Sequence, residues 1–140
     1  MKTRIRIALL IVATMTMTLL FSCSLSPVSI KDRINDFFDS LNGGDRSDTH
    51  KNLDPSTSAY SLADAGFWNS QFPKSGEPYS YTSLDTSDSS DVTMTISDNT
   101  APLGVGAWHF VMVDIGSPSE NWVINDIQQP PGGSGNSIFP

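Results

Sequence analysis

The spacing of apolar residues changes from a helical period to an alternating one partway along the chain, near Pro78. Before this point apolar residues recur every three or four positions, at Ile30, Ile34, Phe37, Phe38 and Leu41. After it, apolar and polar residues alternate, as they do at Val92, Met94 and Ile96. The first period is that of an amphipathic helix and the second that of a half-buried strand. Helices followed by a run of strands predict an α+β domain.

The first helix has a start signal and a stop signal. Ser29 can accept a hydrogen bond from the first free amides, and Asp32, three residues later, places negative charge in the first turn. Gly43-Gly44 follows the last apolar position, and glycine tolerates the left-handed conformation that closes many helices. We therefore expect one amphipathic helix from Ile30 to Leu41, closed by a left-handed glycine.

A shorter helix and four strands are expected after it. Residues 61–72 are compatible with one short helix that Pro73 stops. Four later segments alternate or are continuously apolar: 79–83, 92–97, 107–115 and 121–127. The predicted fold class is α+β, with one amphipathic N-terminal helix and short helices packed on an antiparallel sheet of about four strands.

The N-terminal 22 residues have the three zones of an export signal. Three basic residues precede an apolar run over residues 7–21, which is shorter than the roughly 20 residues that span a bilayer. The run leads to Leu20-Phe21-Ser22-Cys23, which resembles the cleavage site of a bacterial lipoprotein signal. The resemblance implies lipidation of Cys23, with palmitate or a similar acyl chain holding the protein at the cell membrane or outer membrane, on the exported side. A signal cleaved elsewhere, or an uncleaved anchor with Cys23 unmodified, is the alternative.

The chain divides into four segments on these grounds. Residues 1–22 are the expected lipoprotein signal peptide, and residues 23–29 the acylated cysteine and its tether. Residues 30–129 form a single α+β domain. Residues 130–140 are expected to be a disordered tail because prolines and glycines dominate its first half.

The exported part of the chain is strongly acidic. Of 8 basic and 15 acidic residues, the basic Lys2, Arg4 and Arg6 lie in the leader, so residues 23–140 keep five basic residues against all 15 acidic ones. Five scattered cations do not form a basic face, and nucleic acid is therefore excluded as a partner. Cys23 is the chain's one cysteine, and acylation would remove a thiol that has no disulfide partner.

The order of the elements resembles the nuclear transport factor 2-like (cystatin-like) family. The first helix ends in Leu41-Asn42-Gly43-Gly44-Asp45, and the last strand is Trp122-Val123-Ile124-Asn125-Asp126-Ile127. The resemblance covers roughly residues 30–128 and implies that a curved sheet and its helices enclose a pocket open at one end. A generic α+β sandwich with a different strand order is the alternative.

Six aromatic rings would converge on the interior of such a domain. They can line an apolar pocket or simply fill the core, and core filling is the interpretation that a chain with few apolar residues favours. The candidate pocket-lining residues are Phe37, Phe67, Trp68, Trp108, Phe110 and Trp122.

No catalytic residue, metal site or cofactor site is assigned from the sequence. Asp114 and Asp126 lie near strand ends, in phase with Trp108 and Trp122, and are expected to form turns rather than to act as bases. His109 is expected to point away from the aromatic face. His50 and His109 lie too far apart in the sequence to suggest a zinc site. The acidic segment 85–91 lacks the ligand spacing of a calcium loop.

These features predict a lipid-anchored, noncatalytic domain that binds a small apolar ligand or another envelope protein. The alternative is a small tethered enzyme, of isomerase, dehydratase or hydrolase type, that uses Asp114 or Asp126 beside a tyrosine such as Tyr81. Val111 and Val113 are apolar on the sheet face opposite the core. This patch either seats a second subunit, which would give a homodimer through the open sheet face, or is ordinary apolar surface.

Overall fold

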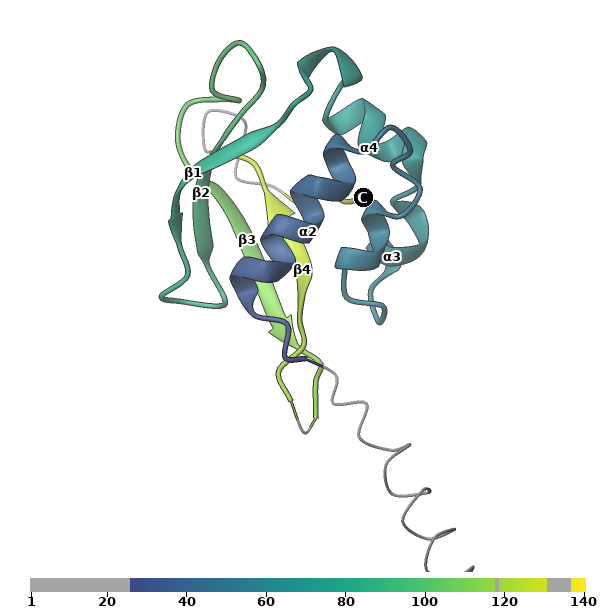
Figure 1. The fold of residues 1–140 in the computed structure, drawn as a ribbon, viewed down its shortest axis with the longest axis vertical. Helices are drawn as coiled ribbons and strands as arrows, with labels where there is room; N and C mark the ends of the chain where they lie inside the picture. The colour runs from purple at the N-terminus through teal and green to yellow at the C-terminus, as the bar shows by residue number, and fades with distance from the viewer. Residues whose placement is uncertain (1–25, 118, 131–136) are drawn as a thin grey trace, which may run out of the picture.

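The computed structural model describes residues 26–117, 119–130 and 137–140. The α-helices are α2 (Ile30–Asn42), α3 (Ser58–Leu62) and α4 (Ala65–Gln71), with short 3₁₀ turns at Thr49–Asn52 and Lys74–Gly76. The strands are β1 (Ser80–Asp85), β2 (Val92–Ser97), β3 (Trp108–Asp114) and β4 (Trp122–Gln128). They form one open antiparallel sheet in the order β1-β2-β3-β4, and the helices pack on one of its faces (Figure 1). The α+β class expected from the sequence is confirmed.

Helix α2 begins as predicted but ends differently. Ser29 Oγ accepts a hydrogen bond from the Asp32 amide (3.1 Å), and the Asp32 carboxylate accepts one from the Ser29 amide (3.4 Å). The predicted left-handed glycine is wrong, because Gly43 is extended, with φ −68° and ψ 147°. Instead, the carboxamide of Asn42 pairs with the backbone N–H and C=O of Tyr79 (2.7 and 2.8 Å) and holds the helix end against the start of β1.

The single helix expected over residues 61–72 is wrong, because the segment holds the end of α3 and, after a break, the whole of α4. Helix α3 ends at Leu62, and Asp64 starts α4 by accepting a hydrogen bond from the Phe67 amide (2.8 Å). The side chain of Asp64 thus supplies the cap that a new helix needs. Among helices of the described residues, none is long and apolar enough to cross a membrane.

The sheet has a buried and an outer face, and β4 changes phase between them. In β2 and β3 the buried side chains alternate, as predicted. In β4 a bulge at Asn125 places Ile124 opposite Met112 but Asp126 opposite Val111. The extra residue moves Asp126 to the outer face, so the expectation that Asp126 shares a face with Trp122 is wrong.

The end of the chain returns to the domain. Ser137 bridges to Gln128, and the amide of Ile138 donates to the carbonyl of Ile127 (2.8 Å). The ring of Phe139 stacks on Phe67, with centroids 5.5 Å apart, and Figure 1 places the C-terminus beside α4. The predicted disordered tail is therefore wrong for residues 137–140, because two apolar side chains, Ile138 and Phe139, pack against the core. Residues 131–136 of that segment lie outside the described residues.

Candidate functional site

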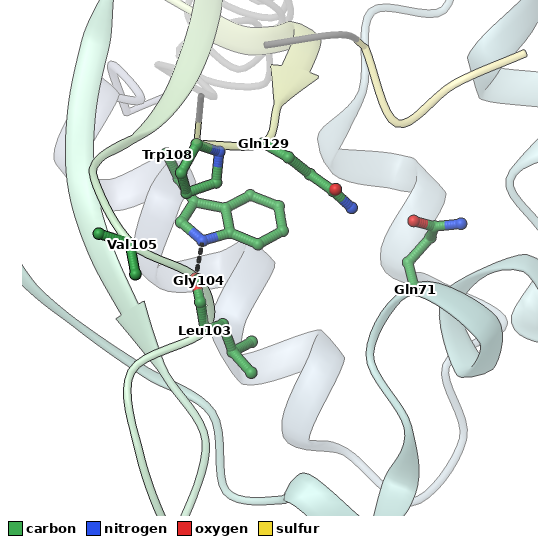
Figure 2. Close-up of a pocket in the computed structure, with 7 residues that line it drawn as sticks. Gln71, Leu103, Gly104, Val105, Trp108 and Gln129 are labelled. Carbon is green, nitrogen blue, oxygen red and sulfur yellow. Dashed lines mark hydrogen bonds between the residues drawn. The ribbon is translucent and has the colours of Figure 1, made fainter. Parts of the chain in front are cut away.

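A pocket of about 410 Å³ lies at the end of the sheet where β3 begins and β4 ends. It is bounded by the last residue of α4, by the loop between β2 and β3, and by the residues that follow β4 (Figure 2). None of its lining residues is charged; they are Gln71, Leu103, Gly104, Val105, Trp108, Gln129 and Pro130. This size is in the range of small-molecule sites.

Trp108 is held in place on two sides. Its indole N–H donates to the carbonyl of Leu103 (2.9 Å), as Figure 2 shows, and its ring lies against the ring of Phe72 (centroids 5.6 Å apart). The side chain is only 5% exposed. The indole is therefore a fixed wall of the pocket rather than a mobile surface group.

Glycines shape the loop that reaches back to the indole. Gly104 and Gly106 have φ values of +83° and +119°, which side chains disfavour. A Cβ at Gly104 would also lie 3.3 Å from Pro130 Cγ. Val105, between the two glycines, is 87% exposed at the rim of the pocket. In this loop the backbone of Gly104 thus lies close to Pro130, and the apolar side chain of Val105 is exposed.

Two glutamines line the pocket together with the indole. Gln71 and Gln129 are both partly exposed, and Figure 2 shows the side chain of Gln129 extending toward the side on which Gln71 lies. Within the part of the chain that the structure describes, neither carboxamide has a hydrogen-bond partner. Each carboxamide can therefore both donate to and accept from a bound molecule. Sequence reasoning missed both residues, because an isolated glutamine carries no motif.

The six candidate rings are mostly distributed through the core. Phe37 is fully buried and contacts Trp68 and Phe110 edge to face, with centroids 5.4 and 5.8 Å apart. Phe67 is partly buried and covered by the C-terminal Phe139. Trp122 is also partly buried, and its carbonyl accepts a hydrogen bond from the Arg33 side chain (2.7 Å). Of the six, Trp108 lines the pocket described above.

The two candidate carboxylates are engaged in local structure. Asp114 accepts hydrogen bonds from the amides of Asn121 (2.8 Å) and Gly116 (2.9 Å), which lower the pKa of its carboxyl. Asp126 accepts hydrogen bonds from the side chains of Ser137 (2.5 Å) and Gln128 (3.1 Å). Asp114 therefore forms a turn, as expected.

Tyr81 does not lie beside either carboxylate. It lies on β1, at the opposite edge of the sheet from β4, and its hydroxyl donates to the side chain of Asn35 (2.5 Å). The enzymatic alternative required Tyr81 to lie beside Asp114 or Asp126. The structure does not bring these side chains together.

The two histidines lie in different places. His109 Nδ1 is 2.6 Å from Asp91 Oδ1, and the side chain occupies the outer face as expected. His50 Nδ1 is 2.7 Å from the carbonyl of Ser47, to which this nitrogen donates. His50 lines a second pocket, of about 320 Å³, with Tyr60, Ser61 and Asp64. Among the described residues, no three histidine, cysteine, aspartate or glutamate side chains group as metal ligands would.

Comparison of the chain with protein-family models, with curated proteins and with solved structures gives no match. The candidate lipidation residue, Cys23, lies outside the described residues.

Proposed function

We propose that this chain is an envelope lipoprotein, anchored through an acylated Cys23, whose noncatalytic domain binds a small uncharged ligand in the pocket beside Trp108. The observation that carries the binding function is the pocket itself, with an immobilised indole and two carboxamides that have no partner in the described chain. The order of long helix, short helices and antiparallel strands supports the nuclear transport factor 2-like relationship, which stays a part of the proposal.

The positions of the tether and the pocket suit such a role. Val28, near the first described residue, pairs with Asn121 just before β4, whereas Gln129 directly follows β4. The seven residues of β4 separate these ends by roughly 23 Å. In Figure 1 the described chain begins at one end of the sheet, below β4. The pocket thus lies at the end of β4 opposite the one where the described chain enters the domain, a placement that suits a membrane anchor at Cys23.

The anchor is tested by labelling. Cells that produce the full chain are fed a fatty acid with a chemical handle, and the protein is analysed for the label. Wild type is expected to carry the label and to lose it in Cys23→Ala. Label retained by Cys23→Ala, or missing from wild type, would contradict the anchor.

The binding site is tested by NMR on the full chain in lipid nanodiscs, with water-soluble neutral aromatic fragments such as benzamide as probes. The indole N–H signal of Trp108 is expected to shift with the probe. Val105→Asp should weaken this shift because it places a charge at the rim without disturbing the core, since Val105 is 87% exposed. Leu62→Asp on α3, also at an exposed apolar position, is the matched control and should bind as wild type does. An unmoved Trp108 signal with every fragment would refute the site.

The enzymatic alternative has less support. A carboxylate that acts as a base near neutral pH has a pKa raised by burial. The pKa of Asp114 is lowered by hydrogen bonds from Asn121 and then Gly116, and Asp126 faces away from the core.

A second copy of the chain on the outer sheet face is also part of the proposal. Val111 and Val113 lie there, partly exposed and beside the polar side chains of β2, and Figure 1 shows the helices on the other face. Sedimentation of the detergent-solubilised chain would show a dimer that Val111→Lys converts to a monomer. A monomeric wild type over the concentration range would contradict this partner.

A further inference from the structure

We infer that the ligand of the Trp108 pocket is a neutral saccharide unit that carries hydroxyl and acetamido groups. This ligand class rests on the proposed binding function and adds the chemistry of what is bound. It follows from the charge of the pocket, its free polar groups, the surface that the indole presents, and the state of the neighbouring backbone.

The pocket offers nothing to a charged ligand. Among the described residues, its lining contains no basic residue to pair with a phosphate or carboxylate, and no acidic residue to pair with an amine. Transfer of an unpaired ion from water into such a site is costly. The negative charge of the exported chain further disfavours anions. The ligand is therefore uncharged.

The carboxamides of Gln71 and Gln129 line the pocket and have no hydrogen-bond partner among the described residues. Each offers an oxygen acceptor and an NH₂ donor. Hydroxyl and acetamido groups are also donors and acceptors at once, so they can satisfy both glutamines without leaving a polar group unpaired. A purely apolar ligand would cover these carboxamides and leave them without partners.

The indole of Trp108 presents carbon atoms to the pocket. Its one polar group, the N–H, is already used by the carbonyl of Leu103. The ring can therefore contribute apolar contact but no hydrogen bond. The C–H face of a sugar ring fits such a surface while the hydroxyl groups at its edge reach the flanking glutamines.

A peptide is disfavoured because the nearby backbone is occupied. Peptides commonly bind by adding a strand to a free sheet edge. Beside the pocket, the carbonyl of Ile127 already accepts from Ile138, and Ser137 bridges to Gln128. In the loop, the amide of Leu103 donates to the carbonyl of Ile96 (2.7 Å). These backbone groups beside the pocket are thus already paired within the chain and are not available to a strand-like peptide.

The test is a titration of the full chain in nanodiscs with N,N′-diacetylchitobiose, followed by NMR of the Trp108 indole N–H and the glutamine side-chain amides. Gln71→Ala and Gln129→Ala are each expected to weaken binding about three- to tenfold, the effect of one hydrogen bond. Gln128→Ala is the matched control. Gln128 neighbours Gln129, but its carboxamide bonds to Asp126, so the affinity should not change. Glucosamine and glucuronate, one cationic and one anionic, should bind more weakly.

The outcomes separate this ligand class from the binding function itself. If diacetylchitobiose moves no signal while neutral aromatic fragments still shift the Trp108 indole, the saccharide class is wrong and the binding function stands. If an acetylated, amidated tripeptide shifts the signals and the disaccharide does not, the ligand is a peptide and the inference is overturned. An equal loss of affinity in Gln128→Ala would also overturn it. If neither the sugars nor the aromatic fragments shift any signal, the binding site itself is refuted as well.

Discussion

The guanidinium of Arg46 is fully buried and lies 2.6 Å from the carboxylate of Glu77, which is 26% exposed. The other terminal nitrogen of Arg46 donates to the carbonyls of Trp68 and Phe72, at the C-terminal end of α4. The Trp68 carbonyl also accepts from the amide of Phe72 (2.8 Å), so the buried cation adds a second donor to that carbonyl and supplies a donor to the carbonyl of Phe72. Because Gln71 lies in the same helix turn, this ion pair fixes one wall of the candidate pocket.

Arg46→Met is expected to destabilise the fold by about 3 kcal/mol, because it breaks a buried ion pair and also removes a hydrogen-bond donor from the carbonyls of Trp68 and Phe72. Glu77→Gln should cost less, since an amide can still accept from Arg46 and the position is partly in water. Urea denaturation of the two variants measures the difference. A loss in Glu77→Gln as large as that in Arg46→Met would contradict the role given to the helix carbonyls.

The loop that carries Leu103 and Val105 should become less stable as the pH falls. Asp98 accepts hydrogen bonds from the amides of Ala101 and Thr100 (both 2.7 Å), and the Ala101 bond, followed by those from Thr100, lowers the pKa of Asp98. Because the folded pKa lies below the unfolded one, the stabilisation is complete above the ordinary aspartate pKa of about 3.9 and is lost as the pH falls through the folded value.

The variant that tests this is Asp98→Asn. Wild type should melt at a higher temperature than Asp98→Asn at neutral pH, and the difference should shrink as the pH falls below about 3.9. Melting curves of both proteins from neutral to acidic pH give the result. A difference that stays constant over this range would show that ionised Asp98 does not hold the loop.

Phe139→Ala is expected to destabilise the domain by about 1–2 kcal/mol, because Phe139 stacks on Phe67 and meets Trp68 edge to face with centroids 6.0 Å apart. The amide of Ile138, which donates to Ile127, should exchange faster with deuterium in this variant. Pro140→Ala is the control, since Pro140 is exposed and should leave both measurements unchanged. Equal stability of Phe139→Ala and wild type would indicate that the segment adds nothing to the fold.

Local patterns explain what the sequence could predict. The alternation of Val92, Met94 and Ile96 and the Ser29 cap depend on neighbours within a few positions, and the structure has both where they were expected. The bulge at Asn125 inserts one residue in β4, and this reversed the face of Asp126. The docking of Phe139 depends on a ring 72 positions away, and no local composition can reveal it. Gln71 and Gln129 are likewise brought to one pocket only by the tertiary fold.

Gly104→Ala should damage both the loop and the binding of neutral ligands. The backbone at Gly104 has φ +83°, and the new methyl group would lie 3.3 Å from Pro130 Cγ, so conformational strain and steric crowding act together. We expect a loss of stability of about 1–2 kcal/mol and faster exchange of the Trp108 indole proton, because its acceptor, Leu103, precedes the glycine. Gly44→Ala is the matched control. Among the described residues, no atom lies within 4 Å of the point that a Cβ at Gly44 would occupy, and Gly44 has no positive φ, so the same substitution there should be neutral or slightly stabilising. If both alanine variants behaved alike, the loop geometry at Gly104 would not be what holds Trp108 in the pocket wall.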